Sequence, residues 1–203
     1  NPDLPDSVYE IEYELIDASV DSDNELTVEF AIYADGTIQD WSSDPTDLGR
    51  DPGFKFAYAM PQQDSDDPAD WNNYGQEGGQ PDGVDLLDLV DEGGTITCDS
   101  TSCVATVPDA FPEGATMRTV AIQGYQQQII DEGTEDEVTH SLHTPSVYIT
   151  VTDDEERRVV VDNDNCASCH EYFEAHGGNR VYEVQVCIMC HNNNLSSSGT
   201  TED

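Results

Sequence analysis

Hydrophobic and polar residues alternate from about residue 8 to residue 152 with the period of two that β-strands produce. Between Tyr9 and Leu15 every second residue is apolar and glutamates fill the alternate positions, and residues 26–32 repeat this pattern. Each run predicts a strand with one buried and one solvated face. Further strands are expected at residues 54–60, 96–98, 103–107, 117–126 and 147–151.

About seven short strands, separated by loops rich in Asp, Gly and Pro, predict a mainly β fold. We expect an antiparallel, immunoglobulin-like β-sandwich over residues 1–153. Residues 61–84 read as an elaborate surface loop, because they are rich in Asp, Gly, Gln and Asn. The apolar run 86–90 fits either a short helical turn or a strand.

The pattern changes after Asp153. Residues 154–158 form a polar hinge, and 159–161 are either a short strand or a lead-in to the next segment. We expect a small C-terminal module with little regular structure at 154–195. Residues 196–203 carry no apolar side chain and are expected to form a flexible tail.

Two Cys-x-x-Cys-His pentapeptides lie in this C-terminal module, at Cys166/Cys169/His170 and at Cys187/Cys190/His191. This motif is the attachment signature of c-type haem, in which both thiols bond to the porphyrin and the histidine binds iron. The sequence therefore predicts two covalently bound haem c groups.

The spacing C-x2-C-x17-C-x2-C also fits a four-thiolate zinc ribbon. A zinc ribbon needs no histidine after either cysteine pair. With five histidines in 203 residues, two such placements arise by chance with a probability of roughly 0.0006. The histidines therefore favour haem over zinc.

Each haem iron has two axial positions, and His170 and His191 fill one position on each iron. Three histidines remain as candidates for the opposite faces, namely His140, His143 and His176.

His176 precedes Gly177 and Gly178, which allow the chain to turn sharply, so we assign it to the haem on the second pentapeptide. The other haem is the alternative for His176. For the first haem we narrowly prefer His143, whose flank Pro145 stiffens, over His140. Both could instead be solvent-exposed loop histidines, or one could reach a haem of a neighbouring copy.

Arg180 stands out in so acidic a chain. A guanidinium suits the carboxylate of a haem propionate, so we count Arg180 as a candidate cofactor-binding residue. A plain surface salt bridge is the alternative.

The charge is extreme, with 44 acidic against 6 basic residues and a net charge of −38. Such a surface repels nucleic acid and anionic membranes, which excludes both as partners. It suits a protein that works in salty surroundings, where ions screen the self-repulsion. Calcium is a weaker possibility at the acidic clusters 17–25 and 64–67, although no EF-hand pattern occurs.

Cys98 and Cys103 flank a polar turn between two β-rich arms, and we expect a disulfide across this hairpin. A disulfide and covalent haem both indicate an oxidising compartment outside the cytoplasm. No apolar stretch is long enough to span a bilayer. Because no leader is visible, we expect Asn1 to be a mature N-terminus after removal of a signal peptide.

The segment 159–193 resembles the cell-surface decahaem cytochromes of metal-reducing bacteria. It carries the Cys166 motif, then His-Gly-Gly-Asn-Arg at 176–180, then the Cys187 motif followed by asparagine. Residues 117–125 resemble the end of the β-barrel or split-barrel domain that precedes each haem cluster there. The resemblance implies extracellular electron transfer through bis-histidine haems, with ligand roles for His170, His176 and His191. The chain departs from that family in having two haem motifs instead of ten.

These observations predict an extracellular dihaem c-type cytochrome that relays single electrons, as a repeating subunit of a polymeric haem filament. The alternative is a soluble or surface-attached shuttle, or a terminal reductase subunit. A different class is an adhesive or ligand-binding β-sandwich with structural or sensory haems. The sequence shows no recognisable pairing of a catalytic nucleophile with a general base, so we expect an electron-transfer protein and not an enzyme.

Overall fold

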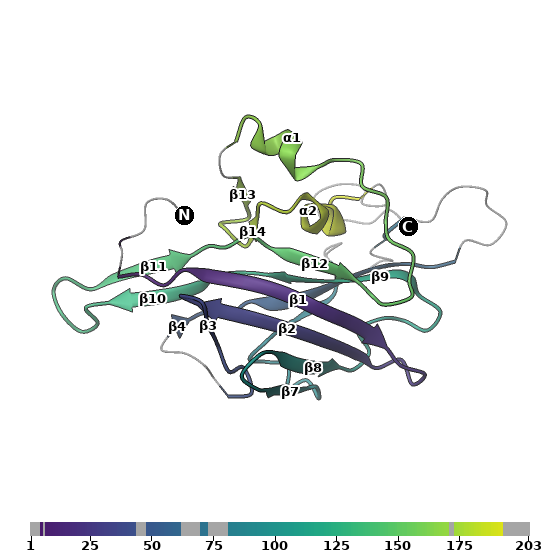
Figure 1. Ribbon diagram of the computed structural model, residues 1–203, viewed down its shortest axis with the longest axis horizontal. Coiled ribbons are helices and arrows are strands. Elements are labelled where there is room, and N and C mark those ends of the chain that lie inside the picture. Colours follow the sequence, from purple (N-terminus) through teal and green to yellow (C-terminus); the bar gives the residue numbers. More distant parts are fainter. Residues whose placement is uncertain are drawn as a thin grey trace.

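The computed structural model describes residues 5, 7–43, 48–61, 70–72, 81–170 and 173–192. The protein is mainly β, with several antiparallel sheets and a small C-terminal region that holds two short helices (Figure 1). This confirms the predicted fold class. The expected flexible tail and the acidic cluster 64–67 lie outside the described residues.

The first sheet contains the strands predicted from the N-terminal alternation. Its strand order is β1-β2-β8-β7, and β3 pairs with β2. The bounds are β1 Ile11–Val20, β2 Leu26–Ala34, β3 Thr37–Ile38, β7 Thr95–Cys98 and β8 Cys103–Val107. Ile11 and Tyr13 are buried, while Glu12 and Glu14 are exposed, so the alternation does mark the inward face.

The second sheet has the order β12-β9-β5-β6, and a third, smaller sheet has the order β11-β10-β4. The second sheet consists of β5 Gly53–Ala59, β6 Gly83–Asp85, β9 Thr116–Gln123 and β12 Val147–Thr150. The third consists of β4 Leu48–Gly49, β10 Gln126–Ile130 and β11 Val138–Leu142.

The core lies between the first two sheets. Phe30 on β2 and Phe54 on β5 are both fully buried, and their rings meet edge to face with centroids 5.4 Å apart. Buried side chains from both sheets belong to one hydrophobic cluster. The sheets are therefore packed face to face, which is the arrangement of a β-sandwich.

A disulfide joins Cys98 on β7 to Cys103 on β8, as expected. The two residues are register partners across the hairpin, with 4.0 Å between their Cα atoms. Cys103 is fully buried, so the bridge reaches into the core.

The structure differs from the predicted pattern in two places and decides between the alternatives in two others. The expected strand 117–126 is two strands, because the chain breaks at Gly124, which has a φ of +110°. The hairpin of β10 and β11 was not expected, since its polar sequence shows no apolar alternation. Of the alternatives left open, residues 86–90 form turns and not a strand, and 159–161 are an exposed lead-in outside any strand.

The C-terminal elements lie together on one side of the sheets (Figure 1). They are α1 Asn163–Ala167, β13 Glu174–Ala175, β14 Arg180–Val181 and α2 Val184–Cys190. Val186 and Met189 of α2 pack in a second apolar cluster with Ala57 on β5, Ala121 on β9 and Trp71. Across the described residues, no helix has the length and apolar character needed to cross a bilayer.

Candidate functional site

The first pentapeptide forms a single helical turn. Cys166 lies on α1, and its carbonyl oxygen accepts hydrogen bonds from the N–H groups of Cys169 at 3.2 Å and His170 at 2.9 Å. Positions three and four residues apart in a helix share a face. The two thiols and the imidazole therefore project from the same side of the turn.

The second pentapeptide repeats this arrangement on α2. The N–H of His191 donates to the carbonyl oxygen of Cys187 at 2.9 Å, which again places both cysteines and the histidine on one face. Glu183 caps the start of α2 by accepting from the N–H of Gln185 at 2.9 Å. Both motifs thus have the local geometry that attachment of one porphyrin to two thiols and one imidazole requires.

The cysteines differ in exposure. Cys169 is exposed, Cys166 and Cys187 are half-buried, and Cys190 is buried. Burial raises the pKa of Cys187, and the carboxylate of Glu183 raises it further. Burial also raises the pKa of Cys190, so both side chains are protonated thiols at neutral pH.

The four cysteines are not assembled as a metal site. Among the described residues no group of three or more His, Cys, Asp or Glu side chains gathers in a way that could hold a metal ion. A tetrahedral zinc ribbon would bring all four thiols together. The acidic residues 17–25 form no such group in the described structure either.

His176 and His191 lie opposite each other, 15 residues apart in the sequence. Their ring centroids are 6.0 Å apart and their planes are inclined by 23°. Two imidazoles on opposite faces of one iron need a centroid separation of about 6 Å, since a metal–nitrogen bond is about 2 Å and the centroid lies about 1 Å further. The separation of the His176 and His191 rings matches this spacing.

The pKa of His176 is lowered from its ordinary value by desolvation, and by the nearby charges of Arg180 and His191. A lowered pKa favours the neutral imidazole, which is the form that binds a metal.

The other histidines make no ring contact with this pair among the described residues. His143 is half-buried; its Nδ1 lies 3.2 Å from the carbonyl oxygen of Gly178, and its ring packs on Tyr125 with centroids 4.6 Å apart. His140 is on β11, opposite Gln128 of β10. His170 is exposed, and no ring contact joins it to another histidine within the described part of the chain.

Arg180 lies on β14 beside the second pentapeptide, where its charge opposes the rise in the pKa of both Cys187 and Cys190. It makes no ion pair with any described residue, although the chain holds 44 acidic residues. A guanidinium in this position can bind a carboxylate such as a haem propionate.

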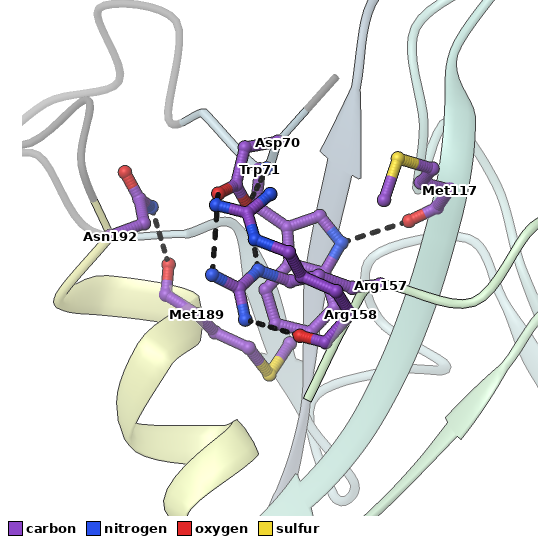
Figure 2. Close-up of polar contacts among 7 residues, drawn as sticks. All are labelled: Asp70, Trp71, Met117, Arg157, Arg158, Met189 and Asn192. Atoms are coloured by element: carbon purple, nitrogen blue, oxygen red, sulfur yellow. Dashed lines mark hydrogen bonds and ion pairs between the residues drawn. The ribbon is translucent and has the colours of Figure 1, made fainter. Parts of the chain in front are cut away.

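Sequence reasoning missed the contacts of Asp70 and Trp71. Arg157 and Arg158 bind the carboxylate of Asp70, at 2.6 Å and 3.0 Å (Figure 2). Both guanidinium groups therefore form ion pairs within the chain. A tryptophan in a polar loop was the one available signal, because so large an apolar side chain is seldom left in water.

Trp71 supports α2 directly. Only 1% of its surface is exposed, and its Nε1 donates to the carbonyl oxygen of Met117 at 2.9 Å. Arg157 lies over its ring at 5.2 Å, and Met189 of α2 packs in the same apolar cluster (Figure 2). The helix that carries Cys187 therefore rests on a tryptophan anchored in the β-sandwich.

The fold is similar to that of MtrC. The crystal structure of MtrC from Shewanella baltica OS185 superposes with a TM-score of 0.51 over 94% of this chain, at 16% sequence identity. This chain spans 31% of that MtrC chain. At such low identity the likeness to MtrC is a likeness of fold. Neither a known family nor a curated protein matches the sequence.

Proposed function

We propose that this protein is an extracellular dihaem c-type cytochrome that relays single electrons. The observation that carries the proposal is the position of His176 opposite His191, directly beside a Cys-x-x-Cys-His turn. A six-coordinate, bis-histidine haem exchanges electrons without offering a free site for substrate. Haem supplies the one-electron chemistry, and the protein supplies binding, orientation and electrostatics.

Each site residue then has a role. Cys166 and Cys169 would hold the first haem, and Cys187 and Cys190 would hold the second. His170 would bind the iron of the first haem, and His191 and His176 would bind the iron of the second.

For the distal face of the first haem we propose His143, with His140 as the alternative, from the same chain or a neighbouring copy. A carbonyl oxygen can only accept, so the contact with Gly178 places the proton of His143 on Nδ1. Nε2 is then free for a metal, which is the usual arrangement in a ligating histidine. Arg180 is proposed to bind a propionate of the second haem.

The fold and a resemblance in sequence both support an extracellular setting. The fold is similar to that of MtrC, and the sequence around both pentapeptides resembles the cell-surface decahaem cytochromes. The disulfide Cys98–Cys103 fits an oxidising compartment.

We further propose that the protein works as a repeating subunit of a haem filament. Two haems in one small chain cannot carry an electron over a long distance, whereas head-to-tail assembly would join successive pairs. With a net charge of −38, neighbouring copies repel each other at low ionic strength. Filament growth should therefore depend on salt, which screens that repulsion.

The decisive experiment is an intact mass and a reduced optical spectrum of protein made in a cell with cytochrome maturation. We expect the polypeptide mass plus two haem groups, and a low-spin spectrum that carbon monoxide does not change. Replacing Cys187 and Cys190 by alanine should remove one haem and leave the other. A colourless protein with the bare polypeptide mass would refute the cytochrome.

Electron microscopy at high and low salt tests the filament. Filaments at high salt support it, while dispersed monomers under both conditions leave a soluble or surface-attached shuttle or reductase subunit. A strong response to carbon monoxide at both haems would instead favour a sensory or binding module.

A further inference from the structure

His143 lies against the loop that follows His176. Its Nδ1 donates to the carbonyl oxygen of Gly178 at 3.2 Å, and its ring packs on Tyr125. Gly178 is buried with a φ of +82°, and a Cβ atom added there would overlap the imidazole ring of His143. The loop backbone and the imidazole therefore touch with no room for a side chain between them.

Asn179 fastens the same loop from its other end. Its carbonyl oxygen accepts from the N–H of Gly124 at 2.9 Å, and its side-chain oxygen accepts from Arg50 at 3.3 Å. Its side-chain N–H₂ donates to the carbonyl oxygen of His176 at 3.1 Å. Arg50 in turn stacks on Tyr125 at 4.3 Å and donates to its hydroxyl at 2.8 Å.

These three side chains, Arg50, Tyr125 and His143, come from three separate segments of the β-sandwich. Together they support residues 176–179, and we call this group of three side chains the loop seat. His176 itself has a φ of +56°, which is uncommon for a residue with a side chain and must be held by its surroundings.

We propose that this loop seat is a positioning device that holds His176 opposite His191 and thereby keeps the second haem six-coordinate. The inference rests on the proposed haem at Cys187 and Cys190. Contacts from the β-sandwich, and not the C-terminal module alone, then determine whether His176 binds the iron of that haem.

The test uses the full-length chain with Cys166 and Cys169 replaced by alanine, which leaves only the second haem. Any ligand role of His143 at the first haem is thereby removed from the measurement. In this background Gly178→Ala should displace the loop, so the reduced haem loses its low-spin spectrum and binds carbon monoxide. Gly177→Ala is the matched control, because Gly177 has a φ of +68° but no atom within 4 Å of an added Cβ. It should stay low-spin.

Two further variants distinguish loss of the contact between His143 and Gly178 from a general loss of stability. His143→Ala should also give a carbon monoxide-binding haem, while His143→Gln keeps an N–H donor for Gly178 and should restore much of the low-spin signal. Amide exchange at Gly124, which donates to Asn179, should be faster in Gly178→Ala than in Gly177→Ala.

Equal spectra of Gly178→Ala and Gly177→Ala would overturn the proposal, even if the exchange rates differ. Equal exchange rates would show that the seat itself does not hold the loop. Failure of the proposed function is separate, because it appears as an absence of covalent porphyrin in the unmutated protein.

Discussion

Arg157 and Asp70 are 87 residues apart in the sequence, yet Nε of Arg157 lies 2.6 Å from Oδ1 of Asp70. Both side chains are largely buried, with 6% and 10% of their surfaces exposed. Burial alone raises the pKa of Asp70, but hydrogen bonds from Arg157 and from the N–H of Trp71 outweigh it, and the pKa is lowered. The pair ties the segment that leads into α1 to the loop that carries Trp71.

Asp70→Asn should lower the free energy of unfolding by about 1–3 kcal/mol, because two guanidinium groups lose a charged acceptor. Chemical denaturation measures the effect. Asp91→Asn removes one charge at an exposed site and serves as the control. If both variants lose the same stability, the ion pair has no special role.

Asp154 accepts three hydrogen bonds from Arg118, at 2.8 Å, 2.9 Å and 2.8 Å. Burial raises the pKa of Asp154, but the bonds and charge of Arg118 outweigh it, so the folded pKa lies below the ordinary value. Its stabilising effect is therefore present above about pH 4 and is lost as the pH falls through the folded pKa.

We expect Asp154→Asn to be about 1–3 kcal/mol less stable than the unmutated protein at pH 7. The gap should close as the pH is lowered below about 4. Denaturation curves of both proteins across pH measure the gap, with the exposed neighbour Asp153→Asn as control. A gap that stays constant down to pH 2 would contradict the assignment.

Replacing Cys98 and Cys103 together by serine should cost about 2 kcal/mol of stability, the value expected for a short disulfide loop. The hairpin of β7 and β8 lies on the opposite side of the sheets from α1 and α2 (Figure 1). The haem spectrum should therefore be unchanged while the denaturation midpoint falls. A spectral change would show that the disulfide reaches the haem sites.

Arg180→Gln should lower the reduction potential of the second haem by on the order of tens of millivolts, because a nearby positive charge favours the reduced iron. Arg180→Lys keeps the charge and should stay closer to the unmutated value. Redox titration of the single-haem protein lacking Cys166 and Cys169 measures both. An unchanged potential in Arg180→Gln would remove Arg180 from the haem environment.

Local sequence was enough for features whose parts lie close together in the chain. The alternation in β1 and β2 and the bridge between Cys98 and Cys103 were predicted, and both are observed. The hairpin of β10 and β11 was missed because Gln126, Gln127 and Gln128 give no apolar period, although Gln126 is fully buried.

The expectation that His176 serves the second pentapeptide agrees with its position beside His191, while ligation itself stays a prediction. Nothing in the sequence pointed to the contact of His143 with Gly178, because the two residues are 35 positions apart.

By itself, the sequence determined the chemistry to be expected, since a Cys-x-x-Cys-His turn places its three ligating groups on one helical face whatever surrounds it. It also determined seven of the fourteen strands seen in the described residues, because the alternation of apolar and polar side chains in those strands marks their buried face. Only the tertiary structure decided that Asp70 meets Arg157, that Trp71 lies under α2 and that His143 holds the loop after His176. Those contacts join segments distant along the chain, and their geometry follows from how the sheets and the C-terminal elements pack.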